Sequence, residues 1–169
     1  MNEILSERLV GRKPTREDLE DLAILYRDPL VMKTLSKDGS TLNDEEIRKR
    51  LEGQVNHWDQ HPFGYSVFHH RDDQRFIGRG GLSNYLLGDS AEVELGYAVV
   101  AAEWQQGYAT EMARAWLEVG FKQLKLQTII AFTLPHNFGS RRVMEKVGFQ
   151  YERDFVHGEL PHVLYRVRR

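Results

Sequence analysis

Two glutamates, Glu92 and Glu94, stand two positions apart in a stretch whose apolar and polar residues alternate, residues 91–100. Alternation of this kind predicts a β-strand, and side chains two positions apart leave a strand on the same face. A glutamate on a central strand is costly to bury unless it is paired or protonated, and burial raises its pKa toward that of a useful general base. The structural alternative is a surface carboxylate or an ion-pair partner of Arg79.

After this strand the spacing of apolar residues changes from a strand period to a helical one. Residues 101–106 form a short connection, and the helix that follows begins with Gly107, Tyr108, Ala109 and Thr110. The first turn of a helix has N–H groups without internal partners and the positive end of the helix dipole, and glycine has no side chain to block a ligand. A phosphate or pyrophosphate would fit this turn. A glycine between a strand and a helix is also common in α/β proteins for structural reasons.

A second polar group, NFGS, follows at residues 137–140. Helical spacing over residues 137–147 places Asn137 at the N-cap and Gly148 just past the last turn, so each of them has a structural explanation when taken singly. The ordered combination of these two residues with Gly107 is more informative than any one of them.

Metal and cysteine chemistry find little support in the sequence. The chain has no cysteine, which excludes disulfides, thiolate zinc sites and a cysteine nucleophile. His57 and His61 are four residues apart, a spacing that can bind zinc, but Trp58 stands where the zincin motif has glutamate, and no third ligand lies at a useful distance. We therefore expect no metal site. No Gly-Lys-Ser/Thr follows a glycine-rich loop, which excludes a P-loop nucleotidase.

Length and charge indicate one ordinary domain. A chain of 169 residues can bury about 70% of its unfolded surface, so we expect a single domain over residues 1–169. With 23 Lys and Arg against 25 Asp and Glu, bulk binding to nucleic acid or to an anionic membrane is not expected. The first residues lack a basic region followed by an apolar run, and the longest uncharged apolar stretch is too short to span a bilayer. These features predict a cytoplasmic protein.

Helices and strands must position the polar residues described above. One predicted helix begins with Thr15 as N-cap and ends at Asp28-Pro29, and a second begins at Asn43 and stops before Pro62. A crossover through the helix at Gly107 makes the strand that follows it parallel to the one at residues 91–100. Further strands are expected at 8–13, which would be an edge strand, and at 65–70, 75–82, 127–134, 149–155 and 163–167.

Three segments in this order, ELGYAV, WQQGYATE and NFGSRRVMEKVGF, resemble the GNAT superfamily of acetyl-CoA-dependent N-acetyltransferases. The chain is most similar to the branch of ribosomal-protein N-terminal and polyamine acetyltransferases, which the opening ERLVGRKPTREDLEDL also fits. The resemblance implies a mixed α/β fold whose mostly antiparallel central sheet is splayed between its fourth and fifth strands and flanked by helices. The phosphate loop of the family has Gln or Arg where this chain has Trp104, whereas Gly107 and Ala109 match.

The resemblance also implies how acetyl-CoA, the co-substrate, would be held. The pantetheine arm would insert into the splay and be bound there by Asn137, and Arg141 or Arg142 would lie near the adenosine phosphate unless these arginines are solvated helix charges. The pyrophosphate would be bound by the backbone amides of Gln105, Gln106, Gly107, Tyr108, Ala109 and Thr110. The arm would form strand-like hydrogen bonds with the backbone of Tyr97, Ala98 and Val99.

Transfer to an amine requires a base, because only the unprotonated amine attacks a thioester. Glu94 is the proposed base, acting directly or through water. The departing thiolate gains from a proton donor. Ser140 occupies the position that the family implies for this acid, a tyrosine is the alternative, and a backbone N–H near Val99 would hold the oxyanion.

The predicted reaction is therefore transfer of an acetyl group from acetyl-CoA to a primary amine, either a protein N-terminus, a polyamine or another small amine. The enzyme would act as a monomer or homodimer, with neither nucleic acid nor membrane as a partner. A non-catalytic sensor or scaffold that binds coenzyme A is the alternative, against which Glu94 and Ser140 argue. Charge distinguishes the acceptors, because a polyamine or aminoglycoside pocket would gather carboxylates such as Asp44, Glu45 and Glu46. These acids also have a structural place at a helix N-terminus.

Overall fold

The molecule is built on an eight-stranded sheet with the strand order β1-β2-β3-β4-β5-β6-β8-β7. The computed structural model describes residues 3–36 and 38–169. Neighbouring strands are antiparallel except β5 and β6, which are parallel, as predicted from the crossover helix between them. The strands are Glu3–Leu5 (β1), Leu9–Arg12 (β2), Tyr65–His70 (β3), Phe76–Leu87 (β4), Ser90–Val99 (β5), Thr128–Thr133 (β6), Gln150–His157 (β7) and Leu160–Arg168 (β8).

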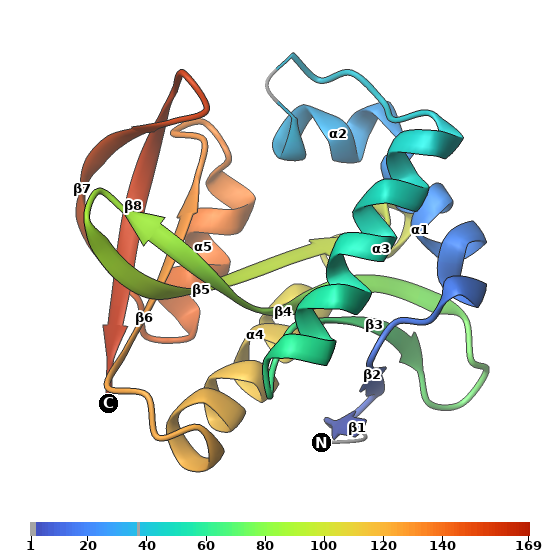
Figure 1. Ribbon diagram of the computed structural model, residues 1–169, viewed down its shortest axis with the longest axis horizontal. Coiled ribbons are helices and arrows are strands. Elements are labelled where there is room, and N and C mark those ends of the chain that lie inside the picture. The colour runs from blue at the N-terminus through green and yellow to red at the C-terminus, as the bar shows by residue number, and fades with distance from the viewer. Residues whose placement is uncertain (1–2, 37) are drawn as a thin grey trace.

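The sheet is splayed between β5 and β6. A single register pair, Glu94 opposite Ile130, joins the two strands, and beyond it they diverge (Figure 1). The splay was predicted correctly, although it falls between the fifth and sixth strands because β1 is too short to give a periodic pattern. β1 also pairs with β2. The prediction that the strand at residues 8–13 forms the edge of the sheet was therefore wrong.

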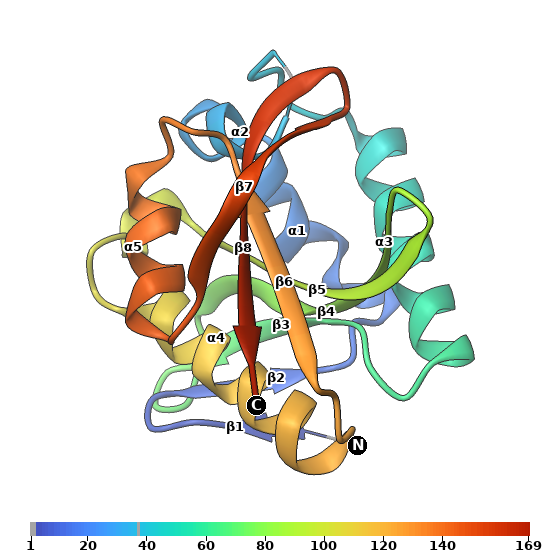
Figure 2. The same cartoon turned by 90° about the vertical axis from the view of Figure 1, so that its left-hand side faces the viewer.

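Helices cover both faces of the sheet (Figures 1 and 2). α1, α2 and α3 pack on the face that carries Ala98, and α4 and α5 pack on the face that carries Leu95 and Val99. None of the helices in the described ranges combines the length and the apolar composition needed to cross a bilayer. The helices are Leu19–Tyr26 (α1), Pro29–Leu35 (α2), Asp44–Gln60 (α3), Tyr108–Glu118 (α4) and Phe138–Lys146 (α5).

The predicted helix starts are confirmed, but one helix was missed. Thr15 caps a short 3-10 turn that leads into α1, and Asn43 caps α3 in a reciprocal capping box with Glu46. Asp28-Pro29, which was interpreted as a helix end, also starts α2, because Asp28 Oδ1 accepts a hydrogen bond from the backbone N–H of Leu30 at 2.8 Å. Proline is favoured in the first turn because it has no N–H that needs a partner there. Three helices therefore precede β3.

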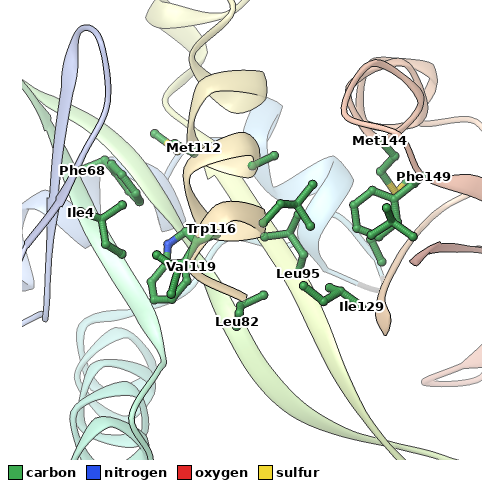
Figure 3. Packing of buried hydrophobic residues seen from close by; sticks show 14 of the residues in the cluster. Ile4, Phe68, Leu82, Leu95, Met112, Trp116, Val119, Ile129, Met144 and Phe149 are labelled. Atoms are coloured by element: carbon green, nitrogen blue, oxygen red, sulfur yellow. The ribbon is translucent and has the colours of Figure 1, made fainter. Parts of the chain in front are cut away.

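The largest hydrophobic cluster lies between α4 and the sheet (Figure 3). Trp116 and Met112 of α4 are fully buried there, together with Leu95 of β5 and Ile129 of β6. Because α4 is anchored on both strands that border the splay, its N-terminal turn has a fixed position relative to the gap between them.

Candidate active site

The turn that enters α4 has an open, amide-lined backbone. Gly107 is the N-cap with φ of 87°, and Gln105 also has a positive φ of 63°. The first intrahelical bond is donated by Glu111 N–H to the Gly107 carbonyl. In the described part of the chain no acceptor is found for the backbone N–H groups of Gln105, Gln106, Gly107, Tyr108, Ala109 and Thr110. Such a row of amides at a helix N-terminus suits a diphosphate.

Side chains from other elements hold this turn in place. Tyr108 is buried, and its hydroxyl accepts a hydrogen bond from Arg75 Nη2 at 3.0 Å. Arg75 also pairs with Glu103 at 2.9 Å. Trp104, 41% exposed, donates its indole N–H to the Val99 carbonyl at 2.8 Å. The tryptophan that replaces the first residue of the family's loop thus ties the loop to the end of β5.

Arg8 contributes a cation to the same turn and is not among the site residues predicted from the sequence. Its Nη2 donates to the Gln106 carbonyl at 3.1 Å, and its guanidinium lies 4.3 Å from the centre of the Tyr108 ring. Glu111 fixes its position by accepting from both the backbone N–H and Nε of Arg8, at 2.7 and 2.9 Å. Arg8 and Gln106 are 98 residues apart, so no local pattern could have linked them.

The end of β5 exposes backbone groups toward the gap. The Val100 N–H donates to the Ile77 carbonyl of β4, and main-chain groups of successive strand residues point to opposite sides. The N–H and C=O groups of Ala98 therefore also face β4, whereas those of Tyr97 and the N–H of Val99 face the gap, and the Val99 carbonyl accepts the Trp104 indole N–H. Of the three residues predicted to pair with the pantetheine arm, Tyr97 and Val99 direct backbone groups into the gap and Ala98 directs its own toward β4; their roles toward the arm remain predictions.

The two glutamates of β5 have different environments. Glu92 forms a bidentate ion pair with Arg166 of β8, with both N–O distances at 2.9 Å, and has a structural partner. Glu94 has no ion pair with any described residue, and its Oε2 accepts a hydrogen bond from Ser83 Oγ at 3.2 Å. Burial raises the pKa of Glu94, an effect only partly opposed by Ser83 and by the positive charge of Arg79. Glu94 is thus the glutamate with the properties of a base.

The side chains of Arg79 and Tyr65 lie next to Glu94 on the same face of the sheet. The Arg79 guanidinium lies over the Tyr65 ring, 4.5 Å from its centre, and Arg79 forms no ion pair with Glu94. A side chain on Gly96 would overlap the Tyr65 hydroxyl, so the glycine makes room for this tyrosine next to the base. Burial and the charge of Glu94 raise the pKa of Tyr65 to about 12, and its phenol stays protonated.

Tyr97 and Ser140 meet on the opposite face of β5. The Tyr97 hydroxyl donates to the Ser140 carbonyl at 3.0 Å and lies 3.0 Å from Ser140 Oγ. Burial raises the pKa of Tyr97. The two candidate acids, the serine and a tyrosine, are therefore hydrogen-bonded to each other, and they approach the gap from the side opposite to Glu94.

The remaining residues predicted to bind the coenzyme are held by the protein itself. Asn137 accepts from the Ser140 N–H at 3.2 Å and donates to Thr133 Oγ1 at 2.9 Å, as a helix cap. Arg141 donates to Tyr165 Oη at 3.1 Å and to the Pro135 carbonyl at 3.0 Å, and it is not a freely solvated charge. Their roles toward a ligand remain predictions.

The rings of His57 and His61 are tilted by 47° with centres 4.5 Å apart, and His57 Nδ1 is 2.9 Å from the Phe63 carbonyl. Among the described residues no group of three or more potential ligand side chains is placed to hold a metal ion.

An amide-lined turn, a strand gap that leads away from it and a partly buried carboxylate beside the gap form the arrangement by which an acyl-CoA transferase would hold its co-substrate. Comparison with known proteins agrees with this class. The acetyltransferase (GNAT) domain family matches residues 8–150. The probable N-acetyltransferase YjcK of Bacillus subtilis (strain 168) is 34% identical over 146 residues, which cover 86% of this chain and 75% of the relative.

Solved structures agree as well. A GNAT-family acetyltransferase from Bacillus anthracis has a TM-score of 0.83 and 28% sequence identity, with 98% of each chain covered. The ribosomal α-N-protein acetyltransferase RimL in complex with coenzyme A shares the fold, with a TM-score of 0.80 at 13% identity over 99% of this chain and 98% of RimL. The chain therefore belongs to the GNAT family of acetyl-CoA-dependent N-acetyltransferases.

Proposed function

We propose that this enzyme acetylates a primary amine by direct attack of the amine on the thioester of acetyl-CoA, without a covalent enzyme intermediate. The observation that carries the proposal is the position of Glu94, a glutamate with a raised pKa and no ion pair in the described chain, at the point where β5 leaves β6. A single domain over residues 1–169 would perform the reaction.

In this proposal the turn before α4 binds the diphosphate of acetyl-CoA through its six free amides. The pantetheine arm then follows the gap and pairs with the backbone of Tyr97 and Val99, which has no partner in β6 beyond Glu94. RimL, which has the same fold, was solved with coenzyme A, and this supports the assignment. Asn137 and the guanidinium of Arg141 would border the arm and the adenosine while keeping their contacts to Ser140 and Tyr165.

The acceptor would approach from the face of the sheet that carries Glu94. Glu94 takes a proton from the ammonium form of the acceptor, and the free amine attacks the carbonyl carbon of the thioester. The Val99 N–H, which points into the gap, would stabilise the oxyanion that forms. The C–S bond then breaks, leaving the amide product and coenzyme A.

The departing sulfur would receive its proton from the pair formed by Tyr97 and Ser140. A single hydrogen-bonded pair explains why both a serine and a tyrosine fit the role of acid: Tyr97 donates to the Ser140 carbonyl, so the Ser140 hydroxyl can donate to Tyr97 Oη. To protonate the sulfur, one of these hydroxyls must turn toward it, and the second proton lost by the attacking nitrogen then replaces the proton given up.

The test is release of thiol from acetyl-CoA, measured with a panel of amines that includes spermidine, an aminoglycoside, simple alkylamines and peptide N-termini. We expect Glu94→Gln to lower kcat by about 10²-fold or more while leaving the affinity for coenzyme A, measured by calorimetry, nearly unchanged. A fully active Glu94→Gln enzyme would contradict the assignment of the base.

Glu92→Gln is the matched control, because Glu92 leaves β5 on the same face but is occupied by Arg166. We expect this variant to keep most of the activity at a temperature well below its unfolding transition. Binding of coenzyme A without acetyl transfer to any amine would favour the non-catalytic sensor or scaffold instead.

A further inference from the structure

Five aromatic and histidine side chains gather on the face of the sheet that carries Glu94: Tyr85, Phe132, Phe155, His157 and His162. We call this group the aromatic wall. The Phe132 ring is at its centre, with centroid distances of 4.9 Å to Tyr85, 5.3 Å to Phe155, 4.9 Å to His157 and 5.7 Å to His162. The Tyr85 hydroxyl is 2.8 Å from His157 Nδ1, which ties the β4–β5 hairpin to the β7–β8 hairpin.

The wall begins next to the proposed base. Phe132 lies two residues beyond Ile130, the register partner of Glu94, so it borders the gap on the same face. Tyr85 lies two residues beyond Ser83, the hydrogen-bond partner of Glu94. Burial and the negative charge of Glu94 raise the pKa of Tyr85. If an amine is bound at Glu94, its substituent would therefore lie against the aromatic wall.

The charges on this face do not suit a polycation. On the face shared by β4, β5 and β6, Glu94 is the one carboxylate without an ion pair in the described chain, because Glu92 is bound to Arg166. Arg79 is only 8% exposed, and its Nε has no partner among the described residues. A second ammonium group near Glu94 would meet this buried cation and find no second free carboxylate.

Two of the three acids that could have bound a polyamine, Asp44 and Glu46, are engaged elsewhere. Asp44 pairs with Arg27, and Glu46 accepts a hydrogen bond from the backbone N–H of Asn43 at 2.8 Å in the cap of α3. These contacts are the structural role expected of acids in the first turn of a helix. Burial and the neighbouring His162 lower the pKa of His157, which disfavours a positive charge on this imidazole.

We propose that the aromatic wall is the acceptor subsite and that it selects a primary amine on an apolar, flat carrier with no second positive charge, such as an arylalkylamine or a peptide N-terminus with an aromatic first residue. The proposal rests on the transferase activity proposed above. Burial of an apolar substituent against these rings favours binding. A second ammonium group would lose its hydration there without gaining a partner, which opposes binding.

The test compares 3-phenylpropylamine with 1,4-diaminobutane and spermidine in the thiol-release assay. We expect kcat/KM to be at least about 10-fold higher for the aryl amine, which corresponds to 1.4 kcal/mol of discrimination. Phe132→Leu, which keeps an apolar side chain, should lower kcat/KM for the aryl amine by a similar factor. It should leave KM for acetyl-CoA unchanged and lower kcat/KM for the diamine by a much smaller factor.

Tyr151→Leu is the matched control, because Tyr151 is an exposed aromatic residue of the β7–β8 hairpin, which also carries part of the wall, and its ring contacts Tyr165 on the other face. It should not change the preference between amines. Diamines or spermidine as the best acceptors, or equal losses for all amines in Phe132→Leu, would overturn the aromatic subsite and leave the transferase proposal intact. Absence of turnover with every amine would instead refute the transferase proposal, and the subsite with it.

Discussion

At the scale of single residues, the ionised Glu94 side chain should lower the free energy of unfolding. Burial raises its pKa in the folded protein, so the unfolded chain releases this proton at a lower pH than the native state does. The carboxylate has no effect on stability below the unfolded pKa, and it destabilises the fold increasingly as the pH rises through the folded pKa. Glu94→Gln should therefore unfold at higher urea concentration than the wild type at neutral pH, and the difference should vanish at about pH 4.

Urea midpoints of both proteins across this pH range measure the effect. Glu118→Gln, an exposed change on α4, is the control and should show no such pH-dependent difference, since Glu118 is 62% exposed and pairs only with Lys122. A wild type that is the more stable protein at neutral pH would show that Glu94 is a structural carboxylate.

Tyr97 and Ser140 should act as one unit in catalysis. Because their hydroxyls are hydrogen-bonded, removing either one interrupts the same proton donor. We expect Tyr97→Phe and Ser140→Ala each to lower kcat by about 10²-fold, and the double variant to lower it no further. A double-mutant cycle on kcat measures this coupling. Losses that multiply would mean that the two hydroxyls act independently, and a loss confined to one variant would identify the sole donor.

The site could be predicted from the sequence only where its residues are close in the chain. Strand alternation was enough to place Glu94, and the change of period was enough to place Gly107. Arg8 and Phe132 have no local pattern that marks them, because Arg8 reaches the phosphate turn and Phe132 reaches Tyr85 only through the register of distant strands. The alternation of backbone groups that turns Ala98 toward β4 likewise depends on the pairing of β5.

At the scale of elements, the conformation of Gly107 should be essential to the turn before α4. Its φ of 87° is in the left-handed region, where a Cβ is strained by about 1–2 kcal/mol. The nearest side-chain atom to such a Cβ, Arg8 Nη2, would be 3.5 Å away, so space is not the obstacle. We expect Gly107→Ala to lower the free energy of unfolding by about that amount and to weaken coenzyme A binding measured by calorimetry.

Gly53→Ala in α3 is the matched control. A Cβ there would meet nothing within 4 Å, and the residue is inside a helix, so this change should stabilise the protein by about 0.5–1 kcal/mol and leave coenzyme A affinity unchanged. Equal coenzyme A affinity in Gly107→Ala and wild type would exclude this turn as the diphosphate site.

Element boundaries were predictable where the caps are unambiguous. Thr15 and Asn43 form capping boxes with acids three residues later, and both starts were found. Asp28-Pro29 is ambiguous in physical terms, because an aspartate before a proline suits both the end of one helix and the start of the next. The feature that favours a new helix is burial of the apolar residues Val31 and Met32 against α1 and α3.

At the scale of the whole molecule, the splay divides the sheet into two parts, one with β1 to β5 and the other with β6, β8 and β7. One register pair connects β5 with β6. The Arg166 side chain adds a second connection, since it joins Glu92 of β5 to Glu152 of β7 across β6 and β8. α4 packs against both parts through the hydrophobic cluster that includes Leu95 of β5 and Ile129 of β6. A ligand that fills the gap should therefore stabilise the molecule as a whole.

Hydrogen exchange with and without acetyl-CoA can show where such a ligand binds. The amides of residues 105–110 have no acceptor in the described chain, and those of Tyr97 and Val99 face the gap, so all of them should exchange more slowly when acetyl-CoA is bound. At 100 times Kd the ligand adds about 2.7 kcal/mol to the stability, which should raise Tm by about 5–10 °C. Gly107→Ala should lose the protection at residues 105–110. Protection confined to α1 and α3 would show that the coenzyme binds elsewhere, because nothing in the arrangement of the splay places it under those helices.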